Sequence, residues 1–243
     1  MDYYKVLACP LCQDDCLKFD KPDIFVCNTC GRKYPIINIK GHNVPNFLIE
    51  ENWKRGFRGL KGKILIKMSG KPFVRYKEKR KLILDVGCGE NPRGNINLDC
   101  YIPKRIPENF ILANAAFLPF RKESIDIVLS NYSIEHMINP AEFIQNIVKI
   151  SKGKIEIVTD NSEWFGDIIF RLIGSGRIFH DEHYYKWSKE YMSNLLKRVG
   201  VRKYNVILKN LSSNIFVILF SRLGGIPRIG NFFYRDLVIE IRK

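Results

Sequence analysis

Long hydrophobic runs are missing from this sequence. Its 243 residues contain no apolar stretch that approaches the roughly 20 residues of a membrane-spanning helix. The longest candidate, residues 215–220 (IFVILF), has only six residues. The first ten residues, MDYYKVLACP, also lack a basic stretch followed by an apolar one. They therefore predict no signal peptide, and we expect a cytoplasmic protein.

Acidic residues are scarce as well, because 25 Asp and Glu stand against 40 Lys and Arg, a formal net charge of +15. Most of the excess lies in residues 53–81, which hold twelve basic residues and one acid, Glu78. Four aromatic residues interleave with these charges: Trp53, Phe57, Phe73 and Tyr76. Such a pattern suits RNA, whose phosphates attract the charges and whose bases stack on the rings. A solvated lysine-rich linker and a contact with anionic lipid are the other interpretations.

Four of the seven cysteines form two pairs, Cys9 with Cys12 and Cys27 with Cys30, and each pair encloses two residues. In a cytoplasmic chain such pairs are more typical of metal binding than of disulfides. One tight turn presents both sulfurs of a pair to an ion, and two pairs complete a tetrahedral Zn²⁺ site. We therefore predict a closed, structural zinc site. Cys16 breaks the spacing and is expected not to be a ligand.

The surrounding sequence, LACPLC followed by FVCNTCGRKYPIINIKGHNVPNFL, resembles the small zinc-ribbon proteins that accompany RNA and protein methyltransferases. The residues that match the family pattern outside the cysteines are Tyr34, Pro35, Ile36 and Pro45. The turn IKGHNVP is longer than the family normally has, so the contact surface there is expected to differ.

From Lys81 onward the pattern alternates between strands and helices, which is typical of a mostly parallel sheet with helices on both faces. Strands are predicted at residues 82–86, 96–99, 110–113, 125–130, 154–159, 206–208 and 237–241. Helices are predicted at residues 140–150, with Asn139 as N-cap, and at residues 188–199, ending before Gly200. A short helix and a Gly/Pro loop are expected within residues 214–233.

Residues 82–94, LILDVGCGENPRG, place glycines after the first of these strands. A dinucleotide site would need three glycines in the pattern G-x-G-x-x-G and an acid about 20 residues further on. Here the third glycine, Gly94, comes too late, and Asp99 lies only ten residues after Gly89. The usual dinucleotide spacing is therefore excluded. Only six residues separate Gly89 from Ile96, so the first crossover helix is expected to be a single turn or missing.

These motifs, together with ANAAFLPF and SIDIVLSNYSIEHM, resemble the class I, Rossmann-like S-adenosylmethionine-dependent methyltransferases of the type 11 kind. The resemblance covers about residues 80–200 and implies an α/β fold whose mostly parallel sheet has an antiparallel last strand. Together with the cysteine pairs and the basic segment, it predicts three parts: a zinc-ribbon domain at 1–48, a basic linker or helical segment at 49–81 and a methyltransferase domain at 82–243. It also implies S-adenosylmethionine and Zn²⁺ as cofactors.

The resemblance assigns a role to each cofactor-binding candidate. Asp85 offers negative charge near the cationic methionine end, and the glycine loop lets the backbone approach the ligand. Asp99 accepts the ribose hydroxyls, while Asn114 and the Ala115 N–H meet the adenine. The candidates are Asp85, Gly87, Cys88, Gly89, Asp99, Asn114, Ala115, Ser130 and Asn131.

The sulfonium already supplies a neutral leaving group, so the enzyme mainly aligns the reactants, and a base is needed only if the acceptor must lose a proton early. Two histidines are weak candidates for a base. His136 lies in SIEHM, where the Glu-His pair of the family usually braces the loop. His183 lies in FHDEHYYKWS, which is expected to cover the substrate mouth.

The methyl acceptor is left open between three hypotheses. RNA is favoured, because a zinc ribbon ahead of the catalytic domain resembles the arrangement in rRNA guanine methyltransferases. A small-molecule acceptor is the alternative, since many relatives of this kind act on small molecules. A non-catalytic zinc-ribbon binding protein is the third, and the intact glycine loop with Asp85 and Asp99 argues against it.

Overall fold

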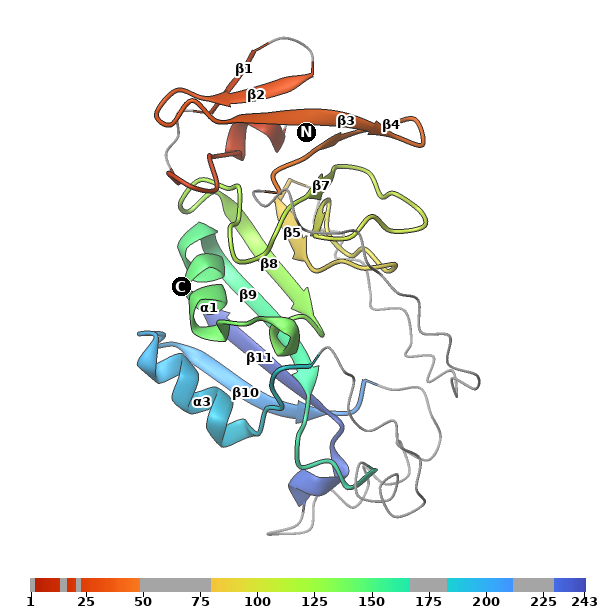
Figure 1. Cartoon of the computed structure of the whole chain (residues 1–243). Coiled ribbons are helices and arrows are strands. Elements are labelled where there is room, and N and C mark those ends of the chain that lie inside the picture. Colours follow the sequence, from red (N-terminus) through yellow and green to blue (C-terminus); the bar gives the residue numbers. More distant parts are fainter. Residues whose placement is uncertain (1–2, 14–16, 21–22, 49–79, 167–182, 212–229) are drawn as a thin grey trace.

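The computed structural model of the chain describes residues 3–13, 17–20, 23–48, 80–166, 183–211 and 230–243 (Figure 1). Most of the basic segment 53–81, the run IFVILF and most of the predicted loop at 214–233 lie outside the described residues. Within the described residues, no helix is both long enough and apolar enough to cross a membrane.

Residues 3–48 form a small antiparallel sheet preceded by one short 3-10 helix, η1 (Tyr3–Val6). The strands pair in chain order: β1 (Leu17–Phe19), β2 (Ile24–Cys27), β3 (Lys33–Ile39) and β4 (His42–Pro45). Tyr34 and Phe47 are buried with ring centroids 4.9 Å apart, and Phe25 packs on Phe47 from β2. This aromatic core compensates for the small amount of apolar surface that so short a sheet can bury.

A seven-stranded sheet makes up the rest, in the order β10-β11-β9-β8-β5-β6-β7. Its members are β5 (Ile83–Val86), β6 (Ile96–Asp99), β7 (Phe110–Leu112), β8 (Ile125–Asn131), β9 (Ser151–Asp160), β10 (Tyr204–Lys209) and β11 (Asp236–Arg242). Strands β5 to β9 pair in parallel, whereas β11 is antiparallel to both of its neighbours. The predicted mixed sheet with an antiparallel last strand is confirmed.

No helix connects β5 to β6, and every residue between Val86 and Ile96 is described. The chain instead turns back at Gly94, where a Cβ atom would meet the carbonyl oxygens of Ile83 and Ile96 at 2.5 Å each. Only glycine fits so close to two neighbouring strands. The sequence predicted that the first crossover helix is either a single turn or missing, and the structure shows that it is missing.

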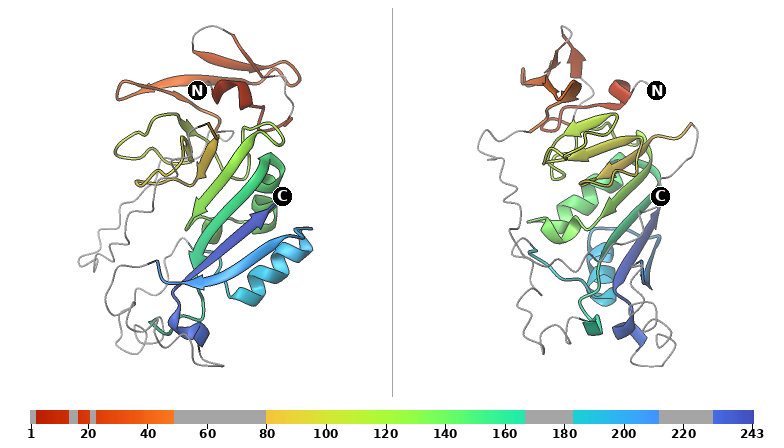
Figure 2. Two further views of the ribbon diagram at one scale, coloured as in Figure 1. Left: turned by 180° about the vertical axis from the view of Figure 1, so that it is seen from behind. Right: turned by 90° about the vertical axis from the view of Figure 1, so that its right-hand side faces the viewer.

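Two α-helices are described. Helix α1 (Pro140–Ile150) begins at Asn139, whose side chain accepts from the Glu142 N–H, and helix α3 (Lys189–Arg198) begins at Ser188 in the same way. The first start agrees with the predicted N-cap at Asn139, and the second with the predicted helix start at residue 188. The helices pack on β9 and β10 and contact each other, so they lie on one face of the sheet (Figures 1 and 2). The described residues do not show the helices predicted on the other face.

The two sheets meet along the β7 edge and share one core. The Phe47 N–H donates to the Leu112 carbonyl oxygen at 2.8 Å, and the Ala8 N–H donates to that of Pro119 at 3.1 Å. One hydrophobic cluster runs from the small sheet to the large one, including Leu7, Phe25 and Phe47 on one side and Leu118 and Phe120 on the other. The small sheet is therefore packed against the large sheet as part of one body (Figure 2).

Candidate functional site

The carboxyl ends of β5, β6 and β8 lie at one edge of the large sheet, because these strands are neighbours and parallel. Gly87 follows β5, Asp99 ends β6 and Asn131 ends β8. Sequence-predicted residues that are far apart in the chain thus come together at this carboxyl edge. Open α/β sheets bind their ligands in this position.

The two glycines of the loop after β5 have different surroundings. Gly87 has a φ of +72°, and a Cβ atom there would collide with the side chain of Ser133; its N–H donates to the Leu98 oxygen at 2.8 Å. Gly89 has a φ of +49° and nothing within 4 Å of its ideal Cβ position. Gly87 is therefore needed for internal packing, whereas Gly89 borders open space at the carboxyl edge.

Asp99 ties the end of β6 to this loop. Its Oδ2 accepts from the Gly89 N–H at 2.8 Å, and its Oδ1 accepts from the Tyr101 N–H at 3.0 Å. Burial raises the pKa of the Asp99 carboxyl, and the N–H groups of Tyr101 and Gly89 oppose this shift by stabilising the charged form. Each carboxylate oxygen has a second lone pair, so Asp99 can still accept from a ligand hydroxyl.

Asp85 is paired inside the protein with Arg93, a residue that the sequence patterns did not single out. Arg93 Nη2 lies 2.8 Å from Asp85 Oδ1, while the Arg93 N–H and Nε donate to Oδ2 at 2.9 and 3.3 Å. The side chains are 5% and 1% exposed. Burial raises the pKa of Asp85 and Arg93 opposes this. The Asp85 charge is thus compensated within the protein.

The adenine candidates follow β7. The Asn114 side-chain oxygen accepts from the Ala116 N–H at 2.9 Å, which fixes a local turn, and Ala115 is buried. Cys88 is also buried, in a cluster with Phe110 and Leu112. Burial raises the pKa of the Cys88 thiol. These residues shape the wall of the carboxyl edge, and the Asn114 oxygen keeps a second lone pair for a ligand.

Ser130 and Asn131, at the end of β8, carry polar atoms that are buried without a hydrogen-bond partner among the described residues. These atoms are Ser130 Oγ and both polar atoms of the Asn131 side chain. Buried polar groups are rarely left unpaired, and each unpaired group costs about 1–3 kcal/mol. Their position beside the glycine loop fits a polar cofactor that completes their hydrogen bonds.

The loop after β8 forms the 3-10 helix η2 (Ile134–His136) and brings a second cluster to this edge. Glu135 and His136 meet His183, with one ligand atom of each within 4.8 Å of the others. The His136 and His183 ring centroids lie 4.5 Å apart. Burial raises the pKa of the Glu135 carboxyl to about 8, and Asp160 adds to this rise. Both weak catalytic candidates from the sequence therefore lie together.

The four predicted zinc ligands also come together, with all four Sγ atoms of Cys9, Cys12, Cys27 and Cys30 within 4.8 Å of one another. The Cys9 and Cys30 sulfurs lie 3.9 Å apart, and Tyr34 Oη lies 3.2 Å from Cys9 Sγ. Gly31, with a φ of +70°, closes the second turn by donating to the Cys27 oxygen at 2.8 Å. Cys16 lies outside the described residues.

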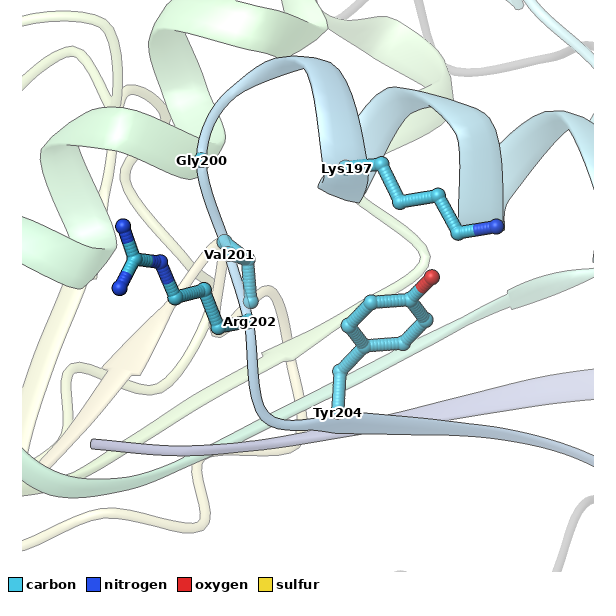
Figure 3. Close-up of a pocket in the computed structure, with 5 residues that line it drawn as sticks. All are labelled: Lys197, Gly200, Val201, Arg202 and Tyr204. Carbon is cyan, nitrogen blue, oxygen red and sulfur yellow. The ribbon is translucent and has the colours of Figure 1, made fainter.

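A shallow hollow lies far from these residues, between the end of α3 and the start of β10 (Figure 3). It is lined by Lys197, Gly200, Val201, Arg202 and Tyr204. Because β10 runs parallel to β9, its first residue lies at the amino edge of the sheet. This hollow is therefore at the opposite edge from the glycine loop.

Comparison with known proteins agrees with this geometry. Residues 62–206 match the family described as a methyltransferase domain, which is more than half of the chain. The chain belongs to this family, and the prediction of an S-adenosylmethionine-dependent methyltransferase is confirmed. No protein of curated function matches the sequence.

Among solved structures, a SAM-dependent methyltransferase from Thermotoga maritima has a TM-score of 0.50 at 18% identity, covering 69% of this chain and 84% of that one. One from Archaeoglobus fulgidus has a TM-score of 0.46 at 18% identity and covers 66% and 85%. Magnesium protoporphyrin IX methyltransferase from Synechocystis, with bound SAH, has a TM-score of 0.43 at 13% identity and covers 67% and 74%. At 18% identity, the match to the Thermotoga maritima structure shows a similar fold and nothing further about this chain.

Proposed function

We propose that this methyltransferase binds S-adenosylmethionine at the carboxyl edge of its large sheet and methylates RNA. When bound, the cofactor supplies an electrophilic methyl group on a sulfonium. The protein's own task is then to hold the cofactor, exclude water and align the acceptor with the methyl group.

Support for the cofactor site comes from the loop after β5 and the strand ends beside it. Gly89 borders open space, and Asp99 is held beside it with lone pairs left for two ribose hydroxyls. Ser130 and Asn131 have buried polar atoms without partners in the described part of the chain. We assign Asn114 and Ala115 to the adenine. Asp85 acts through its ion pair with Arg93, which fixes the loop beneath the methionine end.

The choice of RNA is supported by the packing of Leu48 and by the composition of the segment that follows it. Leu48, the last described residue before it, packs in the cluster that also contains Cys88 of the glycine loop. The last described residue before the segment with twelve basic residues therefore packs beside the glycine loop. We infer that the basic residues of this segment attract phosphates and that the interleaved aromatic rings provide surfaces on which bases stack.

We further propose that Cys9, Cys12, Cys27 and Cys30 hold a structural Zn²⁺ ion. Zinc–sulfur bonds of about 2.3 Å place the sulfurs of a tetrahedral site about 3.8 Å apart, close to the 3.9 Å between Cys9 and Cys30. The Tyr34 hydroxyl, 3.2 Å from Cys9 Sγ, is placed to hydrogen-bond a thiolate ligand. We divide the chain into a zinc ribbon (1–48), a basic segment (49–81) and a methyltransferase domain (82–243).

Transfer of label from methyl-labelled S-adenosylmethionine tests the proposal. The purified protein is incubated with the labelled cofactor and either total RNA or an RNA-free extract of small metabolites. We expect label in RNA, and we expect cofactor binding to be measurable by calorimetry without any acceptor. Label that enters the metabolites alone would favour a small-molecule acceptor, and absent cofactor binding would overturn the proposal altogether.

A further inference from the structure

The cluster of Glu135, His136 and His183 is not needed to hold the methyl donor. Its ligand atoms, two imidazole nitrogens and one carboxylate oxygen, lie within 4.8 Å of one another. Glu135 is 1% exposed, and its Oε1 is buried without a hydrogen-bond partner among the described residues. Both histidines are half-buried, so the cluster combines a buried carboxyl group with two imidazoles that are partly exposed to solvent.

Contacts around the cluster hold its two chain segments in place. Thr159 Oγ1 donates to Glu135 Oε2 at 3.0 Å, which orients the carboxylate and leaves Oε1 available. The N–H groups of Tyr184 and Tyr185 donate to the Glu135 carbonyl oxygen at 2.9 and 3.3 Å, and Tyr185 Oη donates to the Ile138 oxygen at 3.0 Å. His183 is thereby fixed against η2. Such supporting hydrogen bonds are typical of metal sites, where they orient the ligands.

The charge around the cluster favours a cation. Among the described residues, the charged neighbour that acts on Glu135 is Asp160, which is itself an acid. Arg235 lies near Asp160, at 3.8 Å between Nη2 and Oδ1, but this ion pair is partly exposed. A buried carboxylate beside a second acid is costly unless it takes up a proton or a positive charge compensates it, and a bound cation would supply that charge.

We propose that Glu135, His136 and His183 bind one divalent metal ion, separate from the four-cysteine zinc site. Two imidazoles and one carboxylate suit Zn²⁺, Mn²⁺ and their neighbours in the first transition series. Three protein ligands leave at least one coordination position open for water or for an oxygen of a substrate.

The position of this ion suggests what it serves. Ser133, two residues before Glu135, packs against Gly87 of the glycine loop. Its hydroxyl Oγ lies 3.5 Å from the Val86 carbonyl oxygen. The metal site therefore adjoins the methyl-donor site at the same edge of the sheet. This role rests on the proposed function. In it, the ion binds a hydroxyl or phosphate oxygen of the acceptor and so fixes the acceptor beside the methyl group.

Metal binding can be tested without turnover. Zinc-loaded protein, free of any affinity tag, is titrated with Mn²⁺ and, separately, with Zn²⁺; bound Mn²⁺ is followed by electron paramagnetic resonance and bound Zn²⁺ by calorimetry. The cysteine site keeps its zinc in the Mn²⁺ titration, because thiolates favour Zn²⁺ over Mn²⁺. We expect one further ion per chain. His183→Ala should weaken its binding about tenfold or more, whereas His42→Ala, which removes an exposed imidazole from β4, should not.

Glu135→Gln is the second variant, because its amide oxygen can still accept from Thr159 while the other carboxylate oxygen is replaced by an NH2 group, which is a poor metal ligand. We expect it to bind S-adenosylmethionine normally and to lose the additional ion. The proposal is overturned if neither ion binds beyond the cysteine zinc, or if His183→Ala binds it as tightly as the wild type. An ion that binds to a protein without methyltransferase activity would support the metal site and count against the proposed function.

Discussion

Arg93 and Asp85 form a buried ion pair beneath the glycine loop, with the guanidinium Nη2 2.8 Å from the carboxylate Oδ1. Arg93 lies in the short connection between β5 and β6, where no helix forms. The positive charge that faces Asp85, near the end of β5, therefore comes from the Arg93 side chain and from the Arg93 N–H, which donates to Oδ2 at 2.9 Å.

Arg93→Met should destabilise the fold strongly, because it leaves the Asp85 carboxylate buried without a partner. Breaking one side of a buried pair costs about 3–5 kcal/mol. The free energy of unfolding in denaturant measures the loss. The double variant Arg93→Met with Asp85→Asn should recover much of it, and Arg105→Met, at an exposed position, should change it by less than about 0.5 kcal/mol. Equal effects of the two arginine substitutions would contradict this account.

Asp99→Asn should weaken S-adenosylmethionine binding about tenfold or more, because the neutral amide accepts less strongly and one of its ends can only donate. Calorimetry gives the affinity, and the melting temperature shows whether the fold is intact. Asp126→Asn is a matched control, since Asp126 Oδ2 also accepts from a backbone N–H, that of Leu82 at 2.7 Å, but near the start of β8. Unchanged affinity in Asp99→Asn would remove this residue from the site.

Substitution of the two loop glycines by alanine should separate stability from binding. Both have positive φ, so each alanine is strained by about 1–2 kcal/mol. Gly87→Ala adds a collision with Ser133, and we expect the larger fall in melting temperature there. Gly89→Ala meets nothing within 4 Å and should mainly reduce cofactor affinity. Greater destabilisation by Gly89→Ala would show that the surroundings of these glycines have been misread.

Cys27→Ser should release the cysteine-bound zinc and destabilise the large sheet as well as the small one, because the two share a hydrophobic core. Metal analysis should show one zinc fewer per chain. Hydrogen exchange at the Phe47 N–H, which bonds to the Leu112 oxygen in β7, should become faster. Cys100→Ser, outside the cluster, is the control. Zinc retention by Cys27→Ser, or loss in the control, would count against the four-cysteine site.

The sequence predicted elements well where local signals determine them. Strand β6 and helix α1 have the predicted bounds, since a buried run ending in Asp99 and an N-cap followed by Pro140 are both local patterns. Strand β9 is longer than predicted, Ser151–Asp160, because pairing with β8 and β11 extends it past residues of low strand propensity such as Gly153. Propensity alone does not report such pairing.

Side-chain partnerships between distant segments were harder to predict. The pairing of Arg93 with Asp85 depends on the missing crossover helix, and a basic residue inside so short a connection was the one signal for it. The meeting of His136 and His183 depends on hydrogen bonds from Tyr184 and Tyr185 to the Glu135 backbone, which leave no pattern in the sequence. Sequence spacing identified the candidates, and tertiary structure decided which of them act together.

Neutralising part of the basic segment should lower RNA affinity and its dependence on salt. The variant replaces four of its residues by Gln: Lys54, Arg55, Arg58 and Lys61. The matched control replaces four exposed residues between the end of α3 and the start of β10: Lys197, Arg198, Arg202 and Lys203. Two of them, Lys197 and Arg202, line the hollow in Figure 3. Both remove four positive charges, so they change the net charge equally.

For single-stranded RNA, each lost phosphate contact should reduce the slope of log affinity against log salt by about 0.7. If the four residues of the segment each contact a phosphate, the slope should fall by nearly 3, while the control should keep the wild-type slope. Filter binding over a range of salt concentrations gives both slopes. Equal slopes in the two variants would mean that RNA responds only to net charge, and the basic segment would then have no specific part in acceptor binding.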